Sequence, residues 1–288
     1  MRGFGLIYGL VLAGSASAAM AQSASNDLLT PKLTIDGSLP FFFNSNPGQD
    51  KSDPRPGNMF SPYLQIAASG SLRENFGYLF YANTNLDKSL TRLTSDSDDS
   101  QAAIGATLSR RWGDFSVYLT AERGYYLDRV YEGIDGAANN FSITTRYAFG
   151  SADRNFSIRP SLSAAVRLDD DFNVIRYSYN LKADFERRIK GPLWFVMTPR
   201  VRYYLYEFST DDGRRDTMGS ISAGLRYSFN DDVSLTTTVG FEKSASNRPD
   251  RGYENVMVGA SLDFSFGIDG REWLFETPPG DAYAQSRR

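Results

Sequence analysis

Basic side chains at alternating positions are the feature of this chain best suited to chemistry. Between residues 146 and 226, arginine and lysine recur on one parity of five consecutive segments. Alternate residues of a strand point to the same face, so this spacing predicts a basic stripe on one wall of a sheet. Such a stripe favours the binding or passage of anions. The set comprises Arg146, Arg159, Arg167, Arg176, Lys182, Arg200, Arg202 and Arg226.

Other chemistries lack the residues they need. The chain has no histidine and no cysteine, which removes the usual general base near neutral pH, the thiol nucleophile and the thiolate metal ligand. Aspartate runs such as Asp169-Asp170-Asp171 lack the spacing and glycine of a calcium loop. The formal charge of −3 is too mild to indicate a nucleic-acid partner. We expect no catalytic residue, metal site or cofactor.

The segments that carry the basic residues belong to a pattern that runs through the chain from Leu33 to Phe266. Stretches of about ten residues alternate apolar with polar or small side chains, as where Phe115, Val117 and Leu119 alternate with polar neighbours. Each such strand has one apolar and one polar face. Twelve stretches show the pattern: Pro31–Phe43, Phe60–Leu72, Gly77–Asn85, Ser100–Trp112, Asp114–Gly124, Asn139–Phe149, Phe156–Leu168, Val174–Ile189, Leu193–Tyr206, Thr217–Phe229, Val233–Lys243 and Tyr253–Phe266.

The connections between these stretches are alternately tight and longer. The tight ones are Arg73–Phe76, Gly113, Gly150–Asn155, Lys190–Pro192 and Asn230–Asp232. The longer ones include Asn44–Met59, Leu86–Asp99, Tyr125–Ala138 and Glu207–Asp216. A soluble sandwich would share the alternation, but short turns on one rim and longer loops on the other are typical of outer-membrane barrels. We therefore predict an all-β fold, a transmembrane antiparallel up-and-down β-barrel of about twelve strands over residues 31–266.

Both ends of the chain extend beyond the predicted barrel. Arg2, the apolar run Phe4–Ala13 and the site Ala19-Met20-Ala21 predict a signal peptide over residues 1–21. Residues 22–30 then form a periplasmic segment, and residues 267–288 form a periplasmic tail or, alternatively, a plug in the lumen. We expect a protein secreted through the inner membrane and inserted into the outer membrane, in contact with lipid and lipopolysaccharide.

Composition and aromatic placement agree with this location. The mean hydropathy of −0.39 suits a barrel, because only alternate residues of each strand meet lipid. Aromatic residues near strand ends predict two interfacial girdles. The tight-turn rim would include Trp112, Tyr147, Trp194 and Phe266, and the loop rim would include Phe41, Tyr126, Tyr204 and Tyr253.

The last stretch, Val256–Phe266, resembles the closing strand of bacterial outer-membrane proteins, with alternating apolar residues and a terminal aromatic residue. That resemblance implies a porin-like barrel that is read by the barrel assembly machinery during biogenesis. The chain departs from the family in the 22 residues that follow Phe266. The region Arg214–Asn255 is also similar in style to barrels linked to polysaccharide export. Twelve-stranded porins for acidic oligosaccharides are similar in strand number and in their basic tracks.

Two functions of different class follow from these patterns. A barrel of about twelve strands lies between barrels that side chains fill and open porins, so we expect a narrow pore. In the first hypothesis it is a passive channel for small anionic solutes or acidic oligosaccharides, with Lys182, Arg200 and Arg202 at the constriction. In the second it is a closed structural or adhesive barrel whose surface loops mediate envelope or polysaccharide-related interactions.

The acidic residues of the same parity bear on this choice. They are fewer and scattered: Glu122, Asp184, Glu186, Glu242 and Asp263. The turns predict that Arg146 lies opposite Arg159, Arg167 level with Arg176, and Lys182 opposite or diagonal to Arg200. Opposed like charges destabilise a sheet, so a purely structural lattice is expected to alternate signs. In the closed alternative, Glu122, Asp184 and Glu186 neutralise the stripe.

Overall fold

The computed structural model describes residues 31–47, 54–91, 99–128, 133–150, 155–207, 212–248 and 251–267. The predicted signal peptide, the segment 22–30 and the tail beyond Gly267 lie outside these residues. Within them no helix is long and apolar enough to cross a membrane. The described strands are β1 Lys32–Asn44, β2 Gly57–Phe60, β3 Tyr63–Arg73, β4 Phe76–Ser89, β5 Asp99–Trp112, β6 Phe115–Asp128, β7 Gly133–Tyr147, β8 Phe149–Gly150, β9 Phe156–Leu168, β10 Val174–Lys190, β11 Leu193–Tyr206, β12 Arg215–Ser228, β13 Val233–Ser246 and β14 Tyr253–Gly267.

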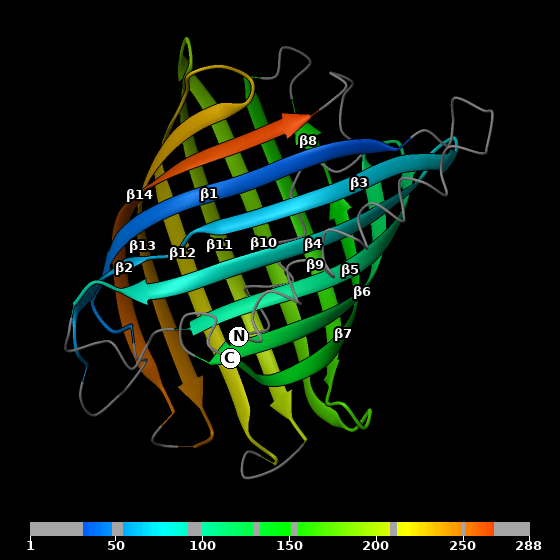
Figure 1. Ribbon diagram of the computed structural model, residues 1–288. Coiled ribbons are helices and arrows are strands. Elements are labelled where there is room, and N and C mark those ends of the chain that lie inside the picture. Colours follow the sequence, from blue (N-terminus) through cyan, green and yellow to red (C-terminus); the bar gives the residue numbers. More distant parts are fainter. Residues whose placement is uncertain are drawn as a thin grey trace.

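These strands form one antiparallel barrel, which β1 and β14 close (Figure 1). β2 and β3 occupy one strand position, interrupted at Ser61 and Pro62, because both pair with β1 and β4. β7 and β8 share another position, since both pair with β9. Fourteen strands therefore fill twelve positions around the ring, and the predicted fold class is confirmed.

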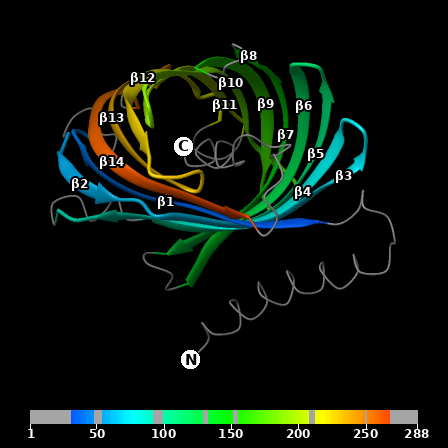
Figure 2. The same ribbon diagram turned by 90° about the horizontal axis from the view of Figure 1, so that it is seen from above.

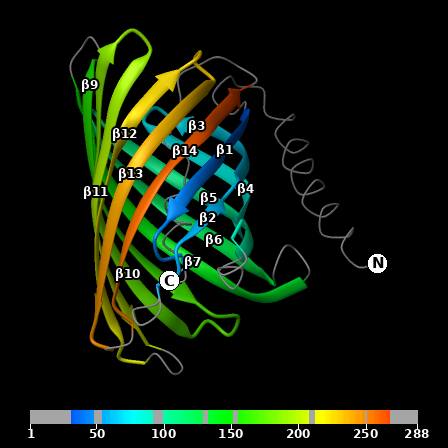
Figure 3. The ribbon, with the colours of Figure 1, turned by 90° about the vertical axis from the view of Figure 1, so that its left-hand side faces the viewer.

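Two parts of the ring matter for the lumen. We call β7 and β9–β12 the basic wall, because they carry the eight predicted basic residues. We call β1–β6 the opposite wall. Viewed along the barrel, β10 and β11 lie across the ring from β1 and β4 (Figure 2). In the side view, β10–β12 again lie across the barrel from β1, β3 and β4 (Figure 3).

The barrel is apolar outside and polar inside. Phe80, Leu119 and Leu181 are more than half exposed, at 53%, 53% and 56%. Gln65 and Asn180 are only 2% and 3% exposed. This inversion of the usual soluble pattern suits a wall that meets hydrocarbon on its outer face and a polar lumen on its inner face.

Three tight hairpins fix the register at one rim. Two-residue turns link Arg73 to Phe76, Trp112 to Phe115 and Lys190 to Leu193. Their residues Asn75, Gly113 and Gly191 have φ values of 61°, 58° and 54°. The favoured two-residue hairpin turns require positive φ, which asparagine and glycine adopt most easily.

One predicted loop is much shorter than expected. β6 runs to Asp128 and β7 starts at Gly133, so most of the segment Tyr125–Ala138 is strand. Gly136, Ala137 and Ala138 pair with residues of β6. These small residues show no apolar alternation, so the sequence pattern did not indicate that the ladder continues through them.

A glycine allows close packing at the seam. Gly37 of β1 pairs directly with Phe264 of β14. A Cβ atom at Gly37 would lie 2.3 Å from Cζ of Phe264, which is far inside van der Waals contact. The aromatic ring of Phe264 therefore lies over Gly37, at the strand pair that closes the barrel.

Candidate functional site

The ten predicted site residues all have the inward parity of their strands. Their outward neighbours Leu162, Leu181 and Val201 are 55%, 56% and 51% exposed, so the predicted residues lie on the lumen side. The structure places them in different groups. Six join what we call the cationic cluster, in which Glu186 is also included. Its members are Arg146, Arg159, Lys182, Asp184, Glu186, Arg200 and Arg226.

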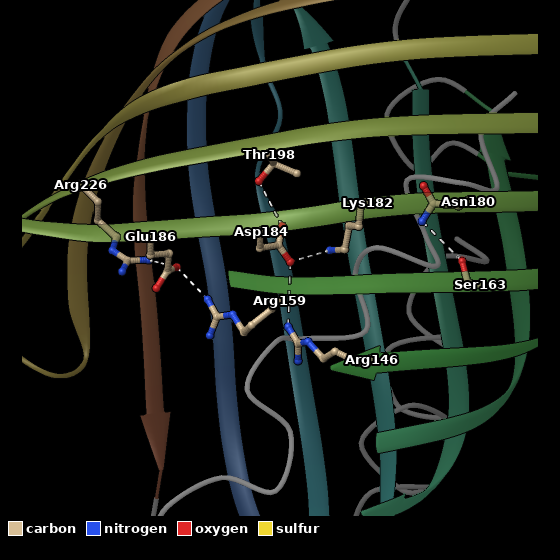
Figure 4. A network of polar contacts seen from close by, with 9 residues as sticks. All are labelled: Arg146, Arg159, Ser163, Asn180, Lys182, Asp184, Glu186, Thr198 and Arg226. Carbon is tan, nitrogen blue, oxygen red and sulfur yellow. Dashed lines mark hydrogen bonds and ion pairs between the residues drawn. The ribbon is translucent and has the colours of Figure 1, made fainter. Parts of the chain in front are cut away.

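Asp184 of β10 is the first centre of the cationic cluster (Figure 4). Its Oδ2 lies 3.2 Å from Nζ of Lys182 and 4.0 Å from Nη2 of Arg146. The hydroxyl of Thr198 donates a hydrogen bond of 3.1 Å to its Oδ1. Arg200 pairs directly with Lys182 in the ladder. Two cations from two strands thus contact one carboxylate, and Arg200 lies beside Lys182 on the adjacent strand.

Glu186, two residues along β10, is the second centre. Its Oε1 lies 2.9 Å from Nη2 of Arg159 and 2.9 Å from Nη1 of Arg226. These arginines come from β9 and β12, on opposite sides of β10 (Figure 4). The guanidinium of Arg226 also lies 5.6 Å from the ring centroid of Trp194. One carboxylate therefore meets two cations here as well.

The cluster is positively charged and reached by solvent. Five cations and two carboxylates leave a formal charge of +3. The side chains that form its ion pairs are between 10% and 28% exposed, from Lys182 to Arg226. Excess charge is tolerated where water can solvate it, whereas burying an unpaired charge is costly.

The ladder confirms two of the three predicted register relations. Lys182 pairs with Arg200, and Arg176 pairs with Arg167. The prediction that Arg146 lies opposite Arg159 is wrong, because Arg146 pairs with Ser161. Gly150 belongs to a strand and not to the turn, so the hairpin is centred one residue later and its register shifts by two.

Arg202 belongs to a separate, buried group on the loop side of the lumen. Its Nη2 lies 2.7 Å from Oε2 of Glu242, and the two side chains are 6% and 3% exposed. The hydroxyl of Tyr253 donates a 2.8 Å hydrogen bond to the other oxygen of Glu242. Arg202, which is predicted at the constriction with Lys182 and Arg200, thus has its charge matched by Glu242. The constriction itself stays a prediction. Tyr253 lies inside the barrel and not in an outer girdle.

Burial changes at one level on three adjacent strands of the basic wall. The inward residues on the loop side of this level are buried, and their next inward neighbours toward the tight turns are partly exposed. The change falls between Asn180 and Lys182, between Arg202 and Arg200, and between Met218 and Ser220. We call seven of the buried inward residues on this side, from β10 to β14, the loop-side cluster: Arg176, Asn180, Arg202, Tyr204, Met218, Glu242 and Tyr253.

Arg167 and Arg176 lie against tyrosine rings. The guanidinium of Arg167 lies 4.5 Å from the ring centroid of Tyr126. That of Arg176 lies 4.6 Å from the centroid of Tyr204, which is 1% exposed. Cation–π contacts of about 0.5–2 kcal/mol each help these opposed arginines to coexist. Tyr126 and Tyr204 were predicted in the outer girdle, but they contact inward arginines.

Glu122 lies on the opposite wall, apart from the cationic cluster. It is 6% exposed. Tyr81 donates a hydrogen bond of 2.8 Å to its Oε2, and Asn140 donates one of 3.3 Å to its Oε1. Neutral donors thus contact this carboxylate. Of the three acids expected to neutralise the stripe, Asp184 and Glu186 lie among the arginines.

Sequence reasoning missed two residues of the site. Thr198 donates to Asp184, and no charge pattern indicates it. Trp194 was assigned to the outer girdle, but it pairs directly with Arg226 and lies beneath the guanidinium groups of Arg188 and Arg226. Trp194 has the same parity as Arg200 and Arg202, so the alternation alone would have placed it on the inner face.

Comparison with solved structures identifies the class of barrel. An outer-membrane channel from Pseudomonas putida F1 aligns with a TM-score of 0.57 and 12% identity, over 82% of this chain and 96% of that one. A bacterial polysaccharide outer-membrane secretin gives a TM-score of 0.43 at 11% identity, over 82% and 98%. No family profile and no curated protein sequence matches the chain. The first of these likenesses shows that the chain has the fold of an outer-membrane β-barrel channel.

Proposed function

We propose that this protein is a passive outer-membrane channel for small anionic solutes. The observation that carries the proposal is the charge of the cationic cluster, in which five cations accompany two partly exposed carboxylates. Rings and ladders of arginine and lysine favour anions in pores. Acidic oligosaccharides are one class of solute that fits this chemistry.

The size of the effect follows from Coulomb's law. A charge of +3 attracts a monovalent anion about 7 Å away by about 2 kcal/mol in water. Salt at 0.1 M has a Debye length of about 10 Å and halves this attraction to about 1 kcal/mol. That energy corresponds to about a fivefold preference for anions over neutral solutes of the same size.

Reversal potentials across planar bilayers test the proposal. In a potassium chloride gradient at about 0.1 M, we expect chloride to permeate about twentyfold better than potassium, because the charge of +3 repels the cation as strongly as it attracts the anion. The preference should fall toward unity at 1 M salt, where the Debye length is about 3 Å. A preference for potassium, or no conductance by the folded protein, would contradict the channel.

A specific observation favours a second candidate, the closed structural or adhesive barrel. The loop-side cluster is buried, and Arg202, Glu242 and Tyr253 are each at most 7% exposed. A filled lumen would leave function to the outer loops. Swelling of liposomes in small sugars and organic acids separates the two functions. Rapid swelling excludes the closed barrel, and its absence with folded protein supports it.

The proposed location also includes a route of export. We propose that a signal peptide over residues 1–21 is removed, that β14 is read by the barrel assembly machinery, and that lipid and lipopolysaccharide surround the outer face. The apolar outer residues, such as Phe80 and Leu119, support this placement. The intact mass of protein purified from outer membranes should correspond to a start at Gln22, and a retained leader would contradict the export route.

A further inference from the structure

We infer that the cationic cluster binds two anionic groups of one solute at the same time, so that its preferred solutes are dianions with charges about 7 Å apart. The inference rests on the proposed channel function and narrows the class of solute. It comes from the two separate centres on β10, each of which is a carboxylate held between cations.

The spacing of the centres is set by the backbone of β10. Asp184 and Glu186 are two residues apart and point to the same face (Figure 4). A strand rises by about 3.3 Å per residue, so their Cα atoms are about 7 Å apart along the strand. The wall therefore already accommodates two carboxylates at this separation.

Each centre is built by residues from several strands and not by one mobile side chain. Lys182 and Arg146 approach Asp184 from β10 and β7. Arg159 and Arg226 approach Glu186 from β9 and β12. Register fixes the positions of these cations relative to one another. Preorganised cations of this kind suit carboxylates and phosphates, whose oxygens accept several charge-assisted hydrogen bonds.

Arg226 has donors beyond the one that contacts Glu186. A guanidinium has five N–H donors, and Arg226 contacts Glu186 through Nη1 while its side chain remains 28% exposed. Among themselves, the residues of the cluster carry five positive and two negative formal charges. A solute carboxylate can therefore bind beside the resident one without displacing it.

A dianion of the right length gains from the second centre. Once one carboxylate of the solute is bound, the other reaches its centre as an intramolecular step with a high effective concentration. A monoanion lacks this second contact, and a shorter dianion cannot span the two centres. Affinity should therefore depend on length as well as on charge.

Calorimetric titration of the full-length protein, folded in detergent micelles, tests the inference. The probes are adipate, whose carboxyl carbons lie about 6 Å apart when extended, succinate, in which they are closer, and monomethyl adipate, which keeps the chain but carries one charge. We expect adipate to bind about tenfold more tightly than either of the other two.

Equal affinities for the three probes, or no binding of adipate, would overturn the inference. Neither result bears on the reversal potentials. If the channel prefers anions but binds the three probes equally, the dianion site is refuted and the proposed channel function is not. A potassium preference would refute the proposed function itself. The wild-type comparison needs no variant and holds whether or not a substituted protein folds.

A matched pair of substitutions locates the site. Arg226→Gln should reduce the affinity for adipate to about that for monomethyl adipate, because one arm of the second centre is lost. Arg110→Gln removes the same charge from an exposed residue that lies 4.8 Å from the ring centroid of Trp112, with outward parity on β5. This control should keep the tenfold preference, and an equal loss in both variants would assign the effect to general charge.

Discussion

Glu242 and Glu186 both meet arginines on the inner wall, but they do so in different surroundings. Glu242 lies 2.7 Å from Arg202, and its side chain is 3% exposed. Glu186 lies 2.9 Å from both Arg159 and Arg226, and its side chain is 19% exposed. The buried pair has matched charges, whereas the exposed group has two cations for one carboxylate.

The difference shows where this barrel can hold excess charge. A buried ion needs a partner and hydrogen bonds to offset its desolvation, and Glu242 obtains both from Arg202 and Tyr253. The partly exposed cluster can keep a charge of +3 because water reaches it. In the channel that we propose, the excess cations mark the part of the lumen that acts on a solute, and the balanced ones mark the part that stabilises the barrel.

The largest expected effect comes from breaking the buried pair. Glu242→Gln should leave the charge of Arg202 buried without its counter-ion and destabilise the barrel by about 3 kcal/mol. Urea unfolding of the protein from lipid vesicles measures this change. Anion preference should remain close to that of the wild type, because the cationic cluster is intact.

An exposed pair supplies the control for this measurement. Glu254 lies 2.6 Å from Lys243, and the two side chains are 60% and 62% exposed. Glu254→Gln should cost less than about 1 kcal/mol, as is usual for surface ion pairs. Equal losses in the two variants would show that burial does not distinguish them.

A smaller effect, on anion selectivity, is expected from the partly exposed arginines that contact Glu186. The double variant Arg159→Gln with Arg226→Gln lowers the charge of the cluster from +3 to +1. We expect the preference for chloride over potassium to fall about sevenfold at 0.1 M salt. Reversal potentials measure the change, and the stability should fall less than in Glu242→Gln. An unchanged preference would show that these arginines lie off the path of the ions.

Much of the fold could be predicted because alternate residues of each barrel strand face lipid and lumen, and therefore alternate between apolar and polar. The segments Phe156–Leu168 and Leu193–Tyr206 coincide with β9 and β11. The prediction failed where the alternation is weak, at Gly136 to Ala138, and where Gly150 was assigned to a turn although it pairs in the ladder. Small residues fit both strands and turns, so their secondary structure depends on whether a neighbouring strand pairs with them.

The candidate site was predictable in composition but not in arrangement. Parity placed Lys182 and Arg200 on the inner wall, and the ladder confirms that they are opposed. Parity could not show that Arg202 is matched by Glu242, which is 40 residues away in sequence. Ion pairs between strands depend on register and on side-chain reach, and a shift of two residues changes every partner.

The smallest expected effect is a rise in anion preference, and it tests the comparison between Glu186 and Glu242 most directly. Glu186→Gln keeps the shape of the second centre but raises the charge of the cluster from +3 to +4. We expect the preference for chloride over potassium to rise about threefold at 0.1 M salt. Stability should change by less than about 1 kcal/mol, since the group is solvated. A large loss of stability would mean that Glu186, like Glu242, is chiefly a structural partner, and the excess cations would then need another explanation.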